Sequence, residues 1–200
     1  MVASSLLPIA IHNNKLYFLF GREGPTDDAP GWADFGGGVD KGETIFQAAL
    51  REGGEELTGF LGDNKEIEKL IKSNGGVYKI TKDTSIYNTH IFLIDYDEQL
   101  PLYYNRNHTF LLERVDNKYL SKTKLFEKVE IGWFTVQDIK TRIGEFRHFY
   151  QETAEHILSE LPKIEAFLRK NSKSRPKSNK SKKRRNKSKS WKMRNSKTRK

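Results

Sequence analysis

Short apolar runs separated by turn-forming residues predict a set of β-strands. Leu6–Ile11 and Leu16–Phe20 are two such runs, and His12–Asn13–Asn14 between them has the composition of a hairpin turn. An extended segment and three further strands are expected at Trp32–Phe35, Val77–Thr81, Asn88–Asp95 and Glu130–Phe134. Asn88–Asp95 is apolar enough to lie in the middle of a sheet.

Other segments carry apolar residues at helical spacing. Thr44 is expected to cap a helix that runs to about Leu57, where Thr58–Gly59 forms a stop and Gly59 suits the left-handed C′ position. Further helices are expected at Asn64–Ser73, Val136–Thr141 and Glu145–Leu168, the last as one or two helices with a break or a new start at Pro162. Between them, residues 108–115 are compatible with a helix, whereas PLYYNRNH, residues 101–108, is typical of a loop.

This alternation of strands and helices predicts an α/β or α+β sandwich. The distribution of charged residues divides the chain into two parts. Residues 171–200 contain 15 of the 36 Lys and Arg residues and no Asp or Glu, which leaves 21 basic against 26 acidic residues in 1–170. The net charge of +10 therefore belongs to the end of the chain. We expect one mildly acidic folded domain over residues 1–170 and a basic tail over residues 171–200.

The tail, rich in Lys, Arg, Ser and Asn, has too few apolar residues to form a core and is expected to be disordered. Its charge favours binding to the phosphate backbone of RNA, an interaction that is independent of sequence and sensitive to salt. The cluster Lys182–Arg185 is suited to nuclear localisation. A solubilising extension without further function is the alternative.

The chain has no cysteine, which excludes a disulfide framework, a thiolate zinc site and a cysteine nucleophile. Its first residues lack a basic segment before the short apolar run, so we expect a strand there and not a signal peptide. No apolar run approaches the ~20 residues of a membrane span. These features predict a protein of the cytoplasm or nucleus that is neither secreted nor inserted in a membrane.

Glu52, Glu55 and Glu56 lie within five positions of the helix predicted after the three glycines of residues 36–38. Offsets of three and four residues place their carboxylates on one helix face, where like charges repel. A divalent cation explains the cluster, because Mg²⁺ prefers carboxylate oxygens as ligands. A solvated acidic face is the alternative.

The segment Gly36–Phe60 resembles the signature of the Nudix hydrolases. In that signature, a glycine is followed after five residues by Glu, and after seven more by Arg-Glu, an aliphatic residue, any residue and Glu-Glu. The positions in register are Gly37, Glu43, Arg51, Glu52, Glu55 and Glu56. Trp32 and the later segment EIGWF are also similar to that family, and the sequence around the glycines resembles Nudix proteins of large DNA viruses.

Three positions depart from the signature. Gly53 replaces an aliphatic residue, Phe35 replaces a frequent proline, and Thr58 replaces a glycine, as if one residue were inserted before Gly59. Gly53 and its neighbour Gly54 also lie inside the predicted helix, where each costs roughly 1 kcal/mol relative to Ala. Close packing against a strand or a ligand explains them, and a locally irregular helix is the alternative.

The resemblance implies a Nudix-like α/β/α sandwich, in which helices flank a mixed sheet. The implied ligands of Mg²⁺, or of Mn²⁺ in its place, are Glu52, Glu55, Glu56 and the carbonyl of Gly37. The implied catalytic residues are Glu43, Arg51, Glu55 and Glu56, with Glu43 paired to Arg51. Either Glu55 or Glu56 is expected to act also as general base, and Glu127 and Glu130 are the candidates outside the signature.

The reaction implied by the resemblance is Mg²⁺-dependent hydrolysis of the pyrophosphate bond in a nucleoside diphosphate linked to another group. The basic tail favours capped RNA as substrate, and free nucleotides, dinucleoside polyphosphates, ADP-ribose and nucleotide sugars are the other candidates. A non-catalytic Nudix-fold module that binds RNA or regulates a partner is the alternative of a different class. The three intact glutamates argue against it. Trp32 and Phe35 are expected in the core, and His90 is expected to be structural.

Overall fold

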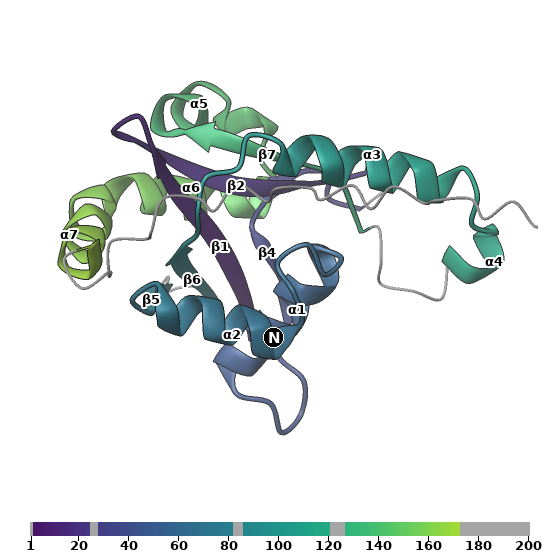
Figure 1. The fold of residues 1–200 in the computed structure, drawn as a ribbon, viewed down its shortest axis with the longest axis horizontal. Helices are drawn as coiled ribbons and strands as arrows, with labels where there is room; N and C mark the ends of the chain where they lie inside the picture. The colour runs from purple at the N-terminus through teal and green to yellow at the C-terminus, as the bar shows by residue number, and fades with distance from the viewer. Residues whose placement is uncertain (1, 25–27, 82–85, 121–126, 173–200) are drawn as a thin grey trace, which may run out of the picture.

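The computed structural model describes residues 2–24, 28–81, 86–120 and 127–172, which form a mixed β-sheet with helices on both faces (Figure 1). This is the α+β sandwich expected from the sequence. The basic tail lies outside the described residues, apart from its first two. Within the described ranges, no helix has the length and apolar character needed to cross a membrane.

The central strand β1 (Ala3–His12) divides one of its edges between two partners. The second half of this edge pairs antiparallel with β2 (Lys15–Glu23), and the first half pairs antiparallel with β4 (Phe35–Gly38). On its other edge, β1 runs parallel to β6 (Tyr87–Leu93). The remaining strands are β3 (Gly31–Ala33) and β7 (Lys128–Thr135), both paired with β2, and β5 (Val77–Thr81), paired with β6. The divided edge brings the glycine segment next to the middle of the sheet.

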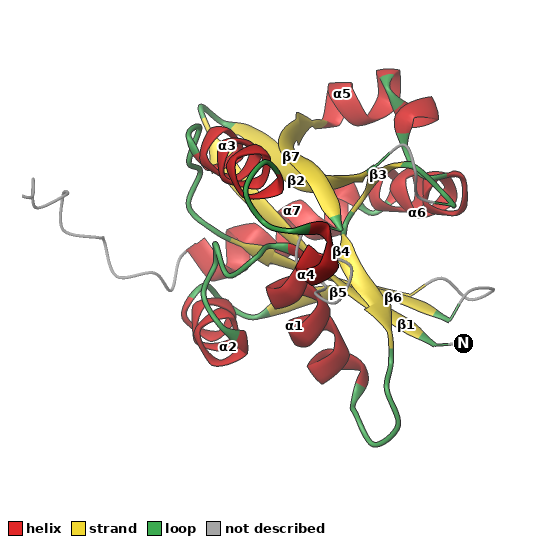
Figure 2. Ribbon diagram, turned by 90° about the vertical axis from the view of Figure 1, so that its right-hand side faces the viewer, coloured by secondary structure: helices red, strands yellow, loops and turns green. Residues whose placement is uncertain are grey.

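Successive strand residues point to opposite faces of the sheet and fill two sides of the core. On β1, Leu7 and Ile9 face one side, which is covered by α5 (Val136–Thr141), α6 (His148–Ser159) and α7 (Leu161–Ser172). Leu6 faces the other side, where it packs with α1 (Ile45–Glu56) and α2 (Asn64–Ser73). That second side is completed by α3 (Leu100–Leu112), and α4 (Asn117–Leu120) follows it; Figure 2 shows the two helical layers in red on either side of the yellow sheet.

The helix α3 occupies the segment 101–108 that the sequence indicated as a loop, so that prediction is wrong. Pro101 stands in the first turn of α3, where its missing N–H removes no helical hydrogen bond. Tyr104 is buried and donates its hydroxyl to the carbonyl oxygen of Glu56 at 2.7 Å, while the Asn105 side chain accepts from the N–H of Ile131 at 2.9 Å. These long-range contacts hold α3 against α1 and β7, and local composition does not indicate them.

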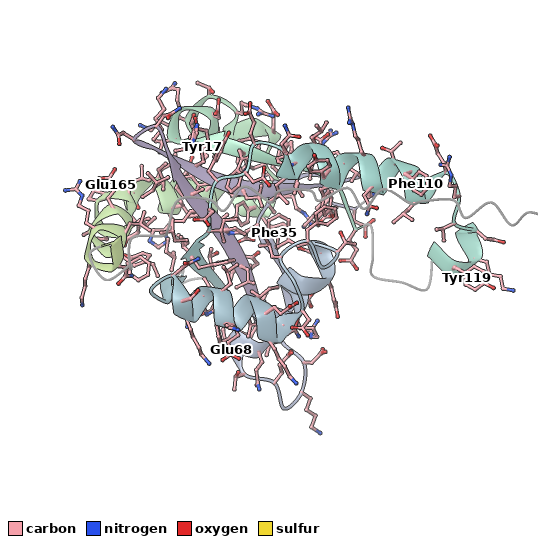
Figure 3. All side chains as sticks on the ribbon, viewed as in Figure 1. Tyr17, Phe35, Glu68, Phe110, Tyr119 and Glu165 are labelled. Carbon is pink, nitrogen blue, oxygen red and sulfur yellow. The ribbon has the colours of Figure 1, made fainter. Side chains whose placement is uncertain are left out.

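Other expectations about packing are confirmed. Trp32 and Phe35 are buried, and Phe35 lies in the interior in Figure 3, whereas Phe110 on α3 is exposed. His90 is buried on β6, with its Nδ1 3.1 Å from the carbonyl oxygen of Ser5. The long periodic segment near the end of the chain forms two helices, and its proline stands in the first turn of α7.

Candidate active site

The glycines of β4 allow this strand to lie against β1 and α1 without intervening side chains. A Cβ atom on Gly36 would lie 2.3 Å from the Cβ of Ser5, and one on Gly37 would lie 2.6 Å from the carboxyl carbon of Glu52. Gly36 also meets the backbone of Ser4 and Ser5, so this position requires glycine, whereas a side chain on Gly37 would displace the carboxylate of Glu52. The carboxylate of Glu52 therefore rests directly on the backbone of β4.

Asp34, in the link between β3 and β4, anchors the entry to this glycine segment. Its buried carboxylate accepts hydrogen bonds from the hydroxyls of Ser5, Tyr87 and Thr89, the last at 3.0 Å. Burial raises the pKa of Asp34, although the hydroxyl donors act in the opposite direction. The link is thereby tied to both β1 and β6.

The helix α1 begins at a capping box and crosses β1 at a glycine. The Thr44 hydroxyl accepts from the N–H of Gln47 at 3.2 Å, and the Gln47 side chain accepts from the N–H of Thr44 at 2.9 Å, so Thr44 is the N-cap as expected. A Cβ atom on Gly53 would lie 2.5 Å from Cδ1 of Leu6 on β1. Close packing against a strand, predicted for this glycine, is confirmed.

The end of α1 differs from the expectation. The helix is capped by Leu57, and the next two residues, Thr58 and Gly59, have φ angles of +50° and +73°. Thr58 therefore holds the C′ position that was predicted for Gly59. A β-branched residue is unfavourable at positive φ, so Thr58 introduces local strain there.

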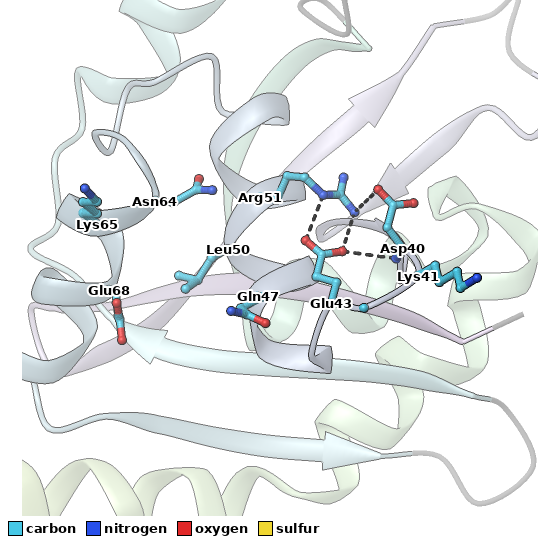
Figure 4. A pocket seen from close by; sticks show the side chains of 10 residues that line it. Asp40, Lys41, Glu43, Gln47, Leu50, Arg51, Asn64, Lys65 and Glu68 are labelled. Atoms are coloured by element: carbon cyan, nitrogen blue, oxygen red, sulfur yellow. Dashed lines mark hydrogen bonds and ion pairs between the residues drawn. The ribbon is translucent and has the colours of Figure 1, made fainter.

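Arg51 of α1 holds the segment between β4 and α1, and Figure 4 shows its contacts with Glu43 and Asp40. Its Nε and Nη2 donate to the two carboxylate oxygens of Glu43, both at 3.0 Å, and Nη2 also donates to the carbonyl oxygen of Gly38 at 3.0 Å. Asp40 adds a longer contact of 3.6 Å to Nη2. The paired Glu43 carboxylate holds the pKa of Arg51 above its ordinary value. The expected pair between Glu43 and Arg51 is present, and it is bidentate.

The third guanidinium nitrogen of Arg51 lies between two other carboxylates. Its Nη1 is 2.6 Å from Oε1 of Glu52 and 3.7 Å from Oε2 of Glu55. Glu52 is buried, whereas the side chain of Glu55 is about one-third exposed, at 33%. These two glutamates of the signature therefore meet at one point, which a cationic nitrogen fills.

Glu56 points to a different set of partners. Its Oε2 accepts from the N–H of Gly36 at 2.8 Å, and its Oε1 lies 3.1 Å from Nζ of Lys128. The ammonium of Lys128 also donates to Glu23, which in turn accepts from Nη1 of Arg147 at 2.8 Å. A chain of alternating charges thus connects α1 with β7, β2 and the N-cap residue of α6.

A family model for the NUDIX domain matches residues 7–156, which is most of the chain. The chain belongs to the Nudix family. Its expected membership and the expected class of enzyme, a pyrophosphohydrolase, are thereby confirmed. Among curated proteins, none matches the chain.

Several solved Nudix structures are similar in fold. An Ap4A hydrolase from C. elegans, solved as a binary complex, has 19% identity and a TM-score of 0.46, with 84% of this chain and 98% of that chain covered. RenU from M. smegmatis has 13% identity and a TM-score of 0.44, over 82% and 88% of the two chains. The NUDIX domain of Shewanella oneidensis NrtR, complexed with ADP ribose, has 10% identity and a TM-score of 0.45, over 82% and 87%. The ligands named for these structures were bound by those proteins and are not assigned to this chain.

Nudix hydrolases generally use divalent metal ions. The glutamate side chains of the signature are of the residue type that binds such an ion. In the part of the chain that the structure describes, no three His, Asp or Glu side chains stand together as a ready metal-binding group. The signature carboxylates are instead neutralised by Arg51 and Lys128. Because carboxylate oxygens are the donors that Mg²⁺ prefers, the point where Glu52 and Glu55 meet suits a divalent cation by its chemistry.

Burial of Glu56 has an electrostatic consequence. It raises the pKa of Glu56 to about 8; Lys128 opposes this shift, and the charges of Glu23 and Glu127 add to it. Burial by itself lowers the pKa of Lys128, but Glu56 and Glu23 outweigh that effect and hold it above the ordinary value. Burial thus favours a proton on Glu56, and the charge of Lys128 counteracts this by favouring the ionised carboxylate.

Lys128, Glu23 and Arg147 were not among the site residues expected from the sequence. Strict alternation along β7 would place Lys128 on the same face as Glu130, which pairs with Arg22 at 2.9 Å. A register shift between β2 and β7, after the pairing of Arg22 with Glu130, brings Lys128 opposite Glu23 instead. An irregularity of this kind has no signal in the sequence of β7.

Proposed function

We propose that this Nudix protein hydrolyses the pyrophosphate bond of a nucleoside diphosphate linked to a second group, with Mg²⁺, or Mn²⁺, as its cation. The observation that carries this proposal is the convergence of Glu52 and Glu55 on Nη1 of Arg51, at 2.6 and 3.7 Å. Two carboxylates that share one cationic nitrogen form a position suited to a cation. Arg51 can release that nitrogen and stay in place, since its Nε and Nη2 remain on Glu43.

The proposed ligands are Glu52, Glu55, Glu56 and the carbonyl of Gly37. When bound there, the cation supplies positive charge for the phosphate oxygens and lowers the pKa of water at the site. The chain keeps these ligands oriented. Arg51 fixes the glycine segment through Gly38 and Glu43, while the N–H of Gly36 and Lys128 fix the two oxygens of Glu56.

The general base is proposed among the glutamates of the signature, with Glu127, which precedes β7, as a candidate outside it. Glu130, the other candidate outside the signature, is paired with Arg22. Within the signature, Glu55 is favoured, because Lys128 and Gly36 engage both oxygens of Glu56.

Capped RNA is the proposed substrate among the nucleoside diphosphate compounds. The support is the basic segment of residues 171–200, which has 15 Lys and Arg residues and no acidic residue. Such a segment adds affinity for the phosphate backbone of a transcript without reading its sequence. A substrate of this kind fits a location in the cytoplasm or nucleus.

The test is turnover of capped RNA and of a panel of nucleoside diphosphate compounds with Mg²⁺ and Mn²⁺, with the products identified. Glu55→Gln is expected to lower kcat by roughly 100-fold or more, because it removes one charge from the proposed cation position. Glu165→Gln makes the same chemical change on α7, which covers the opposite side of the sheet from α1, and is expected to leave turnover unchanged. Wild-type turnover in a folded Glu55→Gln variant would contradict the proposal. RNA binding by the wild type without turnover of any compound would support the non-catalytic module.

A further inference from the structure

Lys128 is a buried cation that the proposed reaction does not use directly. Its side chain is 1% exposed, and it stands between two buried carboxylates, those of Glu23 and Glu56. Charged side chains are rarely buried to this degree unless they are paired, and removal of one partner leaves an uncompensated charge. The position between Glu23 and Glu56 therefore requires a cation.

Three features of the fold place the ammonium of Lys128 between Glu23 and Glu56: the register shift on β7, Gly21 and Arg147. The register shift on β7 turns the side chain inward, as described above. The aliphatic part of Lys128 then passes over Gly21 of β2, where a Cβ atom would lie 2.8 Å from its Cδ and 2.9 Å from its Cγ. Arg147 fixes the far carboxylate, Glu23, at 2.8 Å. Lys128 thus has a preformed path and a preformed end point.

The two cations of the site differ in how they are held. Arg51 is bound to Glu43 through two of its nitrogens and offers only the third to Glu52 and Glu55. Lys128 has a single charged nitrogen, and that nitrogen makes both of its ion pairs. The Arg51 position can therefore exchange its nitrogen for another cation, whereas the Lys128 position cannot.

We propose that Lys128 permanently occupies a second cation position, between Glu56 and Glu23, and acts as a positioning residue for Glu56. Divalent cations then bind only on the side of Glu52 and Glu55, where Glu56, oriented by the lysine, is a further proposed ligand. This inference rests on the proposed metal site. It predicts that loss of the lysine opens the inner position to a divalent cation.

The experiment compares Mn²⁺ binding and thermal unfolding of the full chain in wild type and Lys128→Met. Without metal, we expect Lys128→Met to lower Tm by roughly 10 °C, because Glu23 and Glu56 then face each other uncompensated. With Mn²⁺, we expect the variant to bind one more ion per chain than wild type and to recover most of that loss. Lys128→Arg is expected to restore wild-type stoichiometry, since the guanidinium again supplies the charge.

Lys163→Met is the matched control, because it removes a lysine of α7 from a surface ion pair with Glu160 at the end of α6. It is expected to change neither the number of bound ions nor the response of Tm to Mn²⁺. A Lys128→Met protein with wild-type stoichiometry and a wild-type Mn²⁺ shift of Tm would overturn the inference. A merely structural role for the lysine would give that result.

A second variant covers the case in which Lys128→Met does not fold even with Mn²⁺. Glu23→Gln leaves Glu56 as the one carboxylate on Lys128, so the lysine neutralises it more completely, and Mn²⁺ is expected to bind about tenfold more weakly. Glu145→Gln is its control, and equal Kd values for the two variants would overturn the inference. If wild type itself binds no Mn²⁺, the proposed function fails; if wild type binds Mn²⁺ and the variants behave like their controls, only the role of Lys128 fails.

Discussion

Gly53 lies where α1 crosses the central strand, and Gly53→Ala tests whether close packing selects glycine there. Helix propensity favours Ala over Gly by about 1 kcal/mol. The added methyl group would lie 2.5 Å from Cδ1 and 2.9 Å from Cγ of Leu6, a fully buried residue. Overpacking of this kind costs about 1–3 kcal/mol. We therefore expect a net loss of up to about 2 kcal/mol in the free energy of unfolding.

The adjacent Gly54 provides the matched control, because both glycines lie in the last turns of the same helix. A Cβ atom on Gly54 meets Oδ1 of Asn64 at 2.8 Å, the end of a side chain that can rotate away. Gly54→Ala is expected to gain up to about 1 kcal/mol. Helix propensity contributes equally to both variants. The difference between their free energies of unfolding therefore reports the cost of the overlap with Leu6.

The assay is urea unfolding monitored by circular dichroism. The free energies of unfolding of the variants can be compared if their m values are equal. Gly53→Ala is expected to be less stable than Gly54→Ala by about 1–3 kcal/mol. In a Leu6→Val background the cost of Gly53→Ala should fall, because valine lacks the Cδ1 atom that the added methyl group would contact. Equal stability of the two alanine variants would refute the packing argument.

Three further predictions concern other parts of the chain. Thr58→Asn should raise the free energy of unfolding by up to about 1 kcal/mol, because Asn tolerates positive φ better than a β-branched residue, and an unchanged urea midpoint would contradict this. Burial raises the pKa of Asp34 above 3.8, so the stabilisation linked to its proton is present at low pH and is lost as pH rises. The stability of Asp34→Asn relative to wild type should therefore increase between pH 4 and pH 7 in urea titrations, and a constant difference would count against it. Removal of residues 173–200 should weaken RNA binding and flatten its dependence on salt, and equal slopes for both chains would exclude this role.

The sequence contained the information for the parts of the fold that depend on local pattern. Alternation on β1 separates Leu6 from Leu7 and so defines the two sides of the core. Thr44 and the helix after it follow from a capping signal and from apolar spacing, and the spacing of Glu43 and Arg51 matches a pair that the structure forms. Each of these features rests on residues close together in the chain or on a fixed spacing.

The features that could not be predicted depend on contacts between distant residues. The helix α3 is fixed by Tyr104 and Asn105, whose partners lie on α1 and β7. Lys128 reaches Glu23, 105 positions away, only because the pairing of β2 and β7 shifts by one residue. A charged residue at the start of a strand otherwise indicates exposure to solvent.

The carboxylates gathered around Nη1 of Arg51 are proposed to form the position of a divalent cation. The most direct measurement is the Kd of Mn²⁺ for wild type, Glu55→Gln and the control Glu165→Gln, by calorimetry without substrate. We expect wild type and Glu165→Gln to bind with the same Kd and Glu55→Gln to bind at least about tenfold more weakly. Equal Mn²⁺ affinity in all three proteins, or no binding by wild type, would contradict this proposal.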